Sequence, residues 1–211
     1  MNSTIDEPIV YVVDDDESAR DAMMALFKSV SLESQAFGSA EAFLETANDV
    51  RPGCVLVDLR MPGMSGLDLQ RSLQERGCKL PVIFLSGHGD VSAAVQAMQQ
   101  GAKDFLNKPA DGETVLARVK EMIHADQKRH ATRREQETLV ARLQNLTGRQ
   151  RDVLEAVVRG LTNKEIAREL SISPKTVELH RSHMMHKMHA ESVADVVRMY
   201  LRTADVRKRG V

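Results

Sequence analysis

The chain has 211 residues, more than one average domain requires, so its length favours two domains. With 42% hydrophobic and 28% charged residues it is typical of a globular protein, which excludes disordered, fibrous and membrane-spanning classes. The net charge is −1, but the charges are distributed unevenly: residues 1–141 hold 15 Lys and Arg against 22 Asp and Glu, and residues 142–211 hold 14 against 8. This contrast favours an acidic sensing half joined to a basic half that binds nucleic acid.

Short apolar segments alternate with amphipathic stretches in the first half of the chain. Five segments read as strands: Ile9–Val13, Ser34–Phe37, Cys54–Val57, Val82–Leu85 and Asp104–Leu106. The intervening stretches repeat apolar residues at helical spacing, and the last of them begins near Gly112. Five β-α units in series predict an α/β fold with a doubly wound, five-stranded parallel sheet.

Polar groups stand at the carboxyl ends of four of these strands: Asp14 with Asp15, then Asp58, Ser86 and Lys108. Strand ends of a parallel sheet meet at one edge, where ligands bind, so we expect three carboxylates, a hydroxyl and an ammonium in one space. Crowded carboxylates repel each other, and a divalent cation with a phosphoryl group would relieve that repulsion. Taken alone, the Asp14-Asp15 pair also fits a helix cap.

Residues 124–138 lose the apolar face of the preceding helix but keep opposite charges at helical spacing, as in Arg133 and Glu137, and contain neither Pro nor Gly. This pattern predicts an exposed helical linker that continues the fifth helix, with a flexible tether as the alternative. The expected division of the chain is a first domain at 1–123, the linker at 124–141 and a second domain at 142–211.

The two cysteines, Cys54 and Cys78, lie far apart and outside any metal-ligand spacing, and the chain shows no secretory signal pattern. We therefore expect reduced thiols in a cytoplasmic protein that has no membrane partner.

Helix signals with a tight turn occupy residues 146–203. Ser173 as N-cap and Pro174 at the first helical position predict a new helix. Its inward stripe is Val177, His180, Met184 and Met188. A helix-turn-helix pair in a basic domain favours DNA binding, and a protein-binding bundle is the alternative. The histidines of this helix recur every three residues and so spread around it, which argues against a zinc site.

Four motifs of the first half resemble the receiver domain of two-component response regulators, over residues 8–124. They are Val12-Val13-Asp14-Asp15-Asp16-Glu17, the run from Val57 to Gly66, Ser86-Gly87-His88-Gly89-Asp90, and Phe105-Leu106-Asn107-Lys108-Pro109. The resemblance implies a phosphoacceptor at Asp58 and a switch that binds phosphate, formed by Ser86, Phe105 and Lys108. It also implies a Mg²⁺ (or Mn²⁺) site made of Asp15, Asp58, the backbone carbonyl of Arg60, and Asp14 through a water.

The second half resembles the helix-turn-helix output domain of the LuxR/NarL type, over Thr147–Met188, and the whole chain resembles the FixJ subfamily. The resemblance makes Pro174–Met188 the recognition helix. The DNA contacts that we expect are Asn163, Lys164, Lys175, Thr176, Glu178, Leu179, Arg181 and Ser182. Basic side chains suit phosphate contacts, whereas Glu178 could accept from a cytosine amino group and Leu179 could touch a thymine methyl.

Together these features predict a transcription factor gated by phosphorylation, which catalyses nothing beyond its own phosphotransfer and dephosphorylation. A sensor histidine kinase would phosphorylate Asp58, and the Asp90–Gln100 helix with the Asp104–Leu106 strand would then form a homodimer. The dimer would bind a double-stranded DNA operator, with RNA polymerase as a further partner. One alternative is an aspartyl-phosphate phosphohydrolase, whose Asp-x-Asp spacing Asp14 and Asp16 share although no cap segment is available. Another is a receiver regulated without phosphate.

Overall fold

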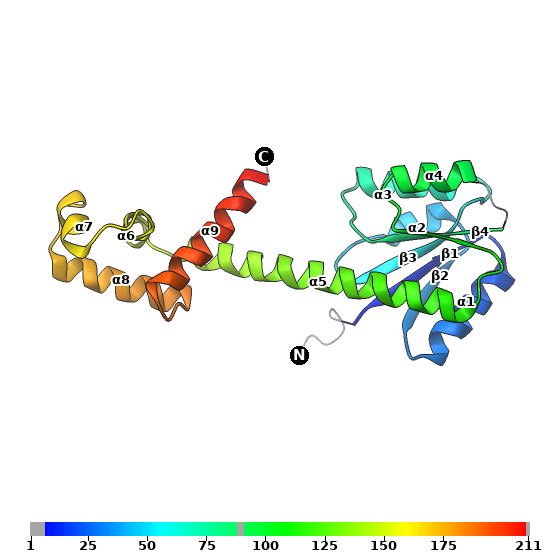
Figure 1. Cartoon of the computed structure of the whole chain (residues 1–211), viewed down its shortest axis with the longest axis horizontal. Helices are drawn as coiled ribbons and strands as arrows, with labels where there is room; N and C mark the ends of the chain where they lie inside the picture. The colour runs from blue at the N-terminus through cyan, green and yellow to red at the C-terminus, as the bar shows by residue number, and fades with distance from the viewer. Residues whose placement is uncertain (1–6, 88–90, 210–211) are drawn as a thin grey trace. The chain divides into compact units, whose positions relative to one another are not determined.

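The structure is a computed structural model that describes residues 7–87 and 91–209. The chain divides into two compact units, residues 1–130 and 131–211, which are described separately below (Figure 1). No helix in the described part of the chain combines the length and the hydrophobicity that a bilayer crossing requires.

The first unit contains a five-stranded parallel sheet in the order β2-β1-β3-β4-β5. The strands are β1 (Ile9–Val13), β2 (Glu33–Phe37), β3 (Gly53–Asp58), β4 (Val82–Ser86) and β5 (Asp104–Asn107). Every residue of β1 and β3 is buried, because helices cover both faces of the sheet, and such strands read as continuous apolar runs. The strand order reverses between β1 and β3, which is where a doubly wound sheet opens its ligand crevice. The predicted fold class is confirmed.

Five helices accompany the sheet, and Figure 1 shows them on its two sides. They are α1 (Glu17–Ser29), α2 (Ala40–Thr46), α3 (Gly66–Glu75), α4 (Val91–Gln99) and α5 (Gly112–Gln144). One core joins the sheet to α2, α3 and α4 through residues such as Phe43, Leu69 and Phe84. The other joins it to α1 and α5 through Phe27 and Val119. The first turns of α1, α2 and α3 are capped by Asp16, Ser39 and Ser65.

Helix α5 runs without interruption through the segment predicted as a helical linker, which confirms its helical character. The expectation that this segment is exposed is wrong for its first turns, since Asp126 and His130 are only 3% and 5% exposed. They continue the buried stripe of Val119 and Ile123 at spacings of three and four residues, so the same face still lies on the sheet. The buried side chains are apolar up to Ile123 and polar at Asp126 and His130, so the spacing of apolar residues does not show that the helix stays buried there.

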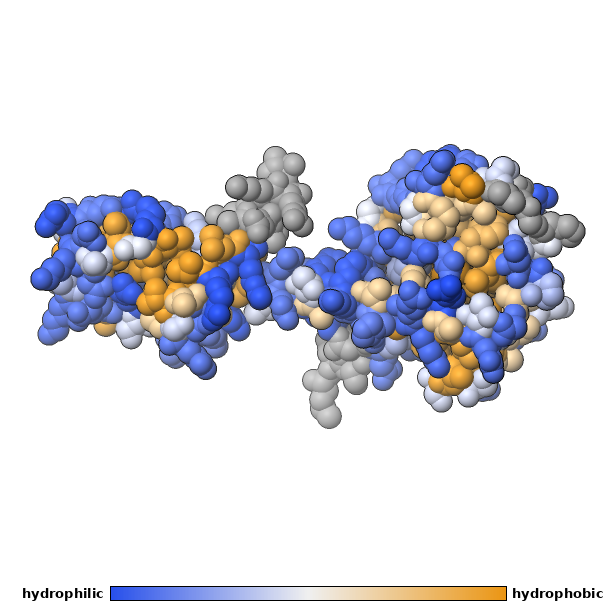
Figure 2. Space-filling view, in the orientation of Figure 1, coloured by the Kyte–Doolittle hydropathy of each residue, from blue (hydrophilic) through white to orange (hydrophobic). Residues whose placement is uncertain are grey.

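The second unit is helical beyond α5, with α6 (Gly148–Val158), α7 (Asn163–Glu169), α8 (Pro174–Met188) and α9 (Val193–Arg209). Thr147 and Thr162 close capping boxes at the starts of α6 and α7, and Ser173 caps α8 with Pro174 at its first position, as predicted. Two small cores hold the helices together, one around Met184 and one around residues such as Ile166. Apolar side chains also reach the surface of this unit (Figure 2). Among the residues of this unit whose exposure is described, the large exposed apolar ones are Leu179, Val193 and Leu201.

Candidate functional site

The carboxyl ends of β1, β3 and β5 bring three charged side chains into direct contact. The ammonium nitrogen of Lys108 lies 2.6 Å from Oδ2 of Asp14 and 2.5 Å from Oδ1 of Asp58. Both aspartates are buried, with exposed fractions of 3% and 8%. Groups that are up to 94 residues apart in the sequence therefore meet at the edge of the sheet where its strand order reverses.

The electrostatics of this cluster favour additional positive charge. Burial alone would lower the pKa of the Lys108 ammonium, but its hydrogen bonds with Asp14 and Asp58 outweigh burial and raise that pKa above its ordinary value. Asp15, beside Asp14, is exposed at the same edge. The carboxylates of Asp14, Asp15 and Asp58 thus all belong to this end of the sheet, and carboxylate oxygens are suitable ligands for a divalent cation.

Each carboxylate oxygen of Asp14 accepts a hydrogen bond. Oδ1 accepts from the backbone N–H of Asp16 at 3.0 Å, and Oδ2 accepts from Lys108. Arg20, which the sequence reasoning did not identify, donates to the carbonyl oxygens of Asp14 and Asp15 at 2.8 and 3.0 Å and so fixes the β1–α1 turn. Asp16 caps α1 by accepting from the N–H of Ser18 at 2.9 Å.

The donor set fits Mg²⁺ better than a metal that needs an all-protein cage. In residues 7–87 and 91–209, no three His, Cys, Asp or Glu side chains form a ready-made metal site. Mg²⁺ is usually bound through one or two carboxylates and keeps several waters, so the exposed Asp15 and the strand-end Asp58 are suitable ligands.

The loop after β3 holds Asp58 in place. The N–H of Arg60 donates to Oδ2 of Asp58 at 2.6 Å, so both carboxylate oxygens have partners. The first residue of α3, Gly66, lies so close that an added Cβ would stand 2.3 Å from the carbonyl oxygen of Asp58. Only glycine fits there. In the sequence Gly66 is only the last residue of the motif that begins at Val57, and nothing there indicates its contact with Asp58.

Ser86 lies on β4, which pairs with the strand of Asp58, and Phe105 lies on β5, one strand further from Asp58. Ser86 is the last residue of β4, is 3% exposed, and its carbonyl oxygen accepts from the N–H of Lys108 at 2.6 Å. The half-buried ring of Phe105 stacks on Phe84, with centroids 6.3 Å apart and planes at 28°. The ends of β4 and β5 are therefore joined both through their backbones and through these two rings. Residues 88–90, which include His88 of the loop motif, lie outside the described residues.

The exposed face of helix α8 carries four of the residues that are expected to contact DNA. Lys175, Glu178, Leu179 and Ser182 are exposed, whereas Val177, Met184 and Met188 on the opposite side are buried and His180 is partly buried. Leu179 is 53% exposed, so its side chain is available for an apolar contact. The inward stripe is confirmed, and the exposed stripe suits the major groove.

Three of the eight expected DNA contacts have partners within the chain. Arg181 donates to Oδ1 of Asn163 at 2.9 Å and so ties α8 to α7. The hydroxyl of Thr176 lies 2.7 Å from that of Ser173 at the N-cap. These residues therefore position the two helices, while Lys164 on α7 is exposed.

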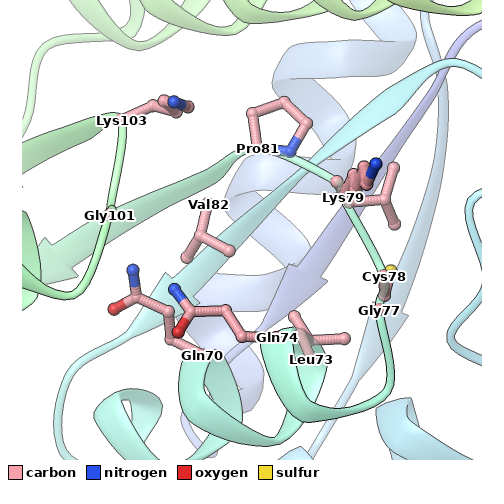
Figure 3. A pocket seen from close by; sticks show the side chains of 11 residues that line it. Gln70, Leu73, Gln74, Gly77, Cys78, Lys79, Pro81, Val82, Gly101 and Lys103 are labelled. Atoms are coloured by element: carbon pink, nitrogen blue, oxygen red, sulfur yellow. The ribbon is translucent and has the colours of Figure 1, made fainter. Parts of the chain in front are cut away.

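A pocket of about 280 Å³ opens at the other end of the strands, next to the residues that begin β4 and precede β5 (Figure 3). Its lining includes Gln70 and Leu73 of α3, Cys78, and Pro81 and Val82 at the start of β4. Because Ser86 at the opposite end of β4 belongs to the strand-end cluster, the pocket is not part of that cluster.

Comparison with protein families gives a match to each half of the chain. Residues 10–120 match the response regulator receiver domain, and residues 144–200 match the luxR family of bacterial regulatory proteins.

Full-length relatives show the same combination. The response regulator protein TmoT of Ectopseudomonas mendocina is 40% identical over 94% of this chain and 90% of its own. The transcriptional regulatory protein FixJ of Azorhizobium caulinodans is 43% identical over 91% of each chain. Among solved structures, the response regulator StyR matches with a TM-score of 0.87 at 38% identity, covering 93% of this chain and 99% of that one. Full-length FixJ from B. japonicum matches with a TM-score of 0.56 at 35% identity, covering 95% and 98%.

Proposed function

Because the chain belongs to the response regulators of two-component systems, with a receiver domain followed by a LuxR-type DNA-binding domain, we propose that phosphorylation of Asp58 by a sensor histidine kinase controls its binding to DNA. The observation that carries this proposal is the contact of Lys108 with both Asp14 and Asp58. It places a cation against the carboxylate that would accept the phosphoryl group, in the crevice where a parallel sheet binds ligands.

In the proposed reaction an oxygen of Asp58 attacks the phosphorus of a phosphohistidine on the kinase. The new O–P bond forms as the N–P bond breaks, and the histidine nitrogen leaves with the bonding electrons. Lys108 offsets charge on the phosphoryl oxygens, and Ser86 donates its hydroxyl to one of them. The groups that would hold Mg²⁺ (or Mn²⁺) are Asp15, Asp58, the carbonyl of Arg60, and Asp14 through a water. When bound, the cation offsets further phosphoryl charge.

The phosphoryl group shifts the receiver toward a conformation that dimerises. It binds best where both Ser86 and Lys108 reach it, so phosphorylation favours that conformation over the resting one. In this proposal Phe105 adjusts with Ser86, because β5 pairs directly with β4. The surface that responds is formed by α4 and β5, where Val95 and Met98 are 49% and 48% exposed and offer apolar area for a second copy.

Two paired output domains then bind an operator in the cytoplasm, where RNA polymerase is a further partner. Lys164, Lys175, Glu178, Leu179 and Ser182 face the DNA in this proposal, and Asn163, Thr176 and Arg181 contact it while holding α7 and α8 together. Pairing raises affinity because the second half-site is met at high effective concentration. We assign the receiver to residues 1–123, the connection to 124–141 and DNA binding to 142–211.

Intact mass measured after incubation with Mg²⁺ and acetyl phosphate tests the acceptor. Wild type should gain one phosphoryl group, and Asp58→Asn none. Asp16→Asn is the matched control, because Asn caps α1 as well as Asp does and this residue contacts neither Lys108 nor Asp58. An adduct on Asp58→Asn, or none on wild type with acetyl phosphate and with a kinase, would contradict the proposal.

A further inference from the structure

Helix α5 carries a buried carboxylate beyond the receiver core that sequence reasoning did not identify. Asp126 is 3% exposed, and its Oδ2 accepts from the backbone N–H of Gly53 at 3.0 Å. Gly53 begins β3, the strand that ends at Asp58. The helix is therefore joined to one end of the strand whose other end is the phosphoacceptor.

Two basic side chains of the same helix complete the contact. Nε of Arg129 lies 2.7 Å from Oδ1 of Asp126, and its Nη1 lies 3.2 Å from Oδ2 of Asp49, in the loop before β3. The ring of His130 is 5% exposed, with Nε2 3.5 Å from Oδ2 of Asp126 and 3.1 Å from Nη2 of Arg129. Burial alone would lower the pKa of Arg129, but its hydrogen bond to Asp126 and their charge attraction outweigh it and raise that pKa.

This cluster is a costly way to pack a helix on a sheet. The stripe before it is apolar, through residues such as Val115 and Val119, and further apolar residues would bury the same face without desolvating a charge. Apolar contacts tolerate rotation and sliding of a helix, whereas a buried carboxylate is satisfied only when its partners lie at fixed positions. The cluster therefore specifies one register of α5 against β3.

The position of Gly53 admits no side chain, and its N–H is free to bond Asp126 because it is not used between β1 and β3. An added Cβ would stand 2.3 Å from the carbonyl oxygen of Ile9, so the backbones of β1 and β3 meet closely at this point. Ile9 donates its N–H to the carbonyl of Pro52, and the N–H of Gly53 points instead to Asp126. The acceptor for this buried donor comes from a residue 73 positions later in the chain.

We propose that Asp49, Asp126, Arg129 and His130 form a clamp that makes α5 rigid with the receiver as far as His130 and holds the helix in one register on β3. The four are positioning residues, and the inference rests on the proposed function. A conformational change that phosphorylation causes in the sheet then reaches the chain from residue 131 onward through α5, because the helix before that point moves together with the receiver.

Hydrogen exchange of the full chain tests the clamp itself. In Asp126→Ala, residues 112–130 should exchange at least about tenfold faster than in wild type, because the helix end opens more easily once its buried partner is gone. Glu137→Gln is the matched control, since it breaks the exposed pair with Arg133 on the same helix outside the clamp. Exchange of β1 reports whether the receiver still folds. If the Asp126→Ala receiver does not fold, the same measurement is made on Asp49→Asn, which removes the charge that pairs with Arg129 at the outer side of the clamp. Unchanged exchange of α5 in a folded variant would overturn the clamp.

DNA binding with and without acetyl phosphate tests its role in signalling. We expect acetyl phosphate to add the same phosphoryl mass to Asp126→Ala and to wild type, while the gain in DNA affinity on phosphorylation falls about fivefold or more in the variant. A merely structural role would leave that gain intact, and this result would overturn the inference. A wild type that shows no gain at all would refute the proposed function and the signalling role together, and the exchange data would still show whether the clamp exists.

Discussion

The ion pairs of Lys108 allow a quantitative prediction for Lys108→Ala. This change removes the ammonium that joins Asp14 and Asp58, whose side chains are only 4% and 11% exposed. Removing one partner of a buried pair costs about 3–5 kcal/mol, because the remaining charge stays desolvated. The Lys108 side chain is 28% exposed, so water can enter on its side. We therefore expect the free energy of unfolding of the receiver to fall by about 2–3 kcal/mol in the absence of divalent cations.

Mg²⁺ should recover part of this loss. A cation that binds only the folded state stabilises it, and two carboxylates without their ammonium attract a cation more strongly than the intact cluster does. Mg²⁺ should therefore raise the stability of Lys108→Ala by more than it raises that of wild type.

Hydrogen exchange of β1 and β3, followed with chelator and with Mg²⁺, measures these stabilities for the receiver alone. Lys103→Ala, at an exposed lysine before β5, is the control and should change stability by less than about 0.5 kcal/mol. A loss below about 1 kcal/mol for Lys108→Ala in chelator, or equal effects of Mg²⁺ on both proteins, would refute the reasoning.

The pH dependence of the same difference has a definite sign. Because the pKa of folded Lys108 lies above its ordinary value of 10.5, its ion pairs stabilise fully below that ordinary value and are lost as pH rises through the folded one. The difference in stability between wild type and Lys108→Ala should thus stay constant from about pH 7 to pH 9 and decrease only in stronger alkali.

Two further predictions concern packing and DNA contacts. Gly66→Ala should destabilise the receiver by about 1–3 kcal/mol and slow its phosphorylation about tenfold or more, because the new methyl group displaces the backbone of Asp58. Mass spectrometry of the phosphorylated protein over time measures this rate. Arg181→Ala should lower both the stability and the DNA affinity of the output domain, since it breaks the bond to Asn163, whereas Lys175→Ala should leave stability unchanged and reduce the salt slope of DNA binding by about one.

Each of these has a simple check. Gly148→Ala, where an added Cβ meets nothing within 4 Å, should leave phosphorylation unchanged, so an equal slowing in both glycine variants would point away from the contact with Asp58. For the DNA contacts, thermal unfolding should separate Arg181→Ala from Lys175→Ala. Identical unfolding of the two variants would show that the Arg181–Asn163 bond does not hold α7 and α8 together.

Local patterns in the sequence determined most of the architecture. Apolar runs and helical spacing identify the strands and helices, because burial of a face leaves a periodic trace in neighbouring residues. Five β-α units in series predict a doubly wound parallel sheet, and the expected site at strand ends, with residues such as Asp58 and Lys108, follows from the rule that ligands bind at one end of such a sheet. The strand order comes from the structure, because the same connectivity is compatible with more than one order. The helical character of residues 124–138 was predictable for the same local reason, since charge pairs at spacing four need no tertiary partner.

Tertiary structure decided the contacts that depend on a polar or small residue meeting a distant one. Asp126 looks like a residue of an exposed helix until the N–H of Gly53, 73 residues away, supplies its partner. Gly66 resembles any turn glycine until Asp58 is placed against it, and Arg181 resembles a phosphate contact until Asn163 accepts its hydrogen bond. A buried apolar residue is recognised by its type, whereas a buried polar residue is defined by its partner, and only the folded chain supplies that partner.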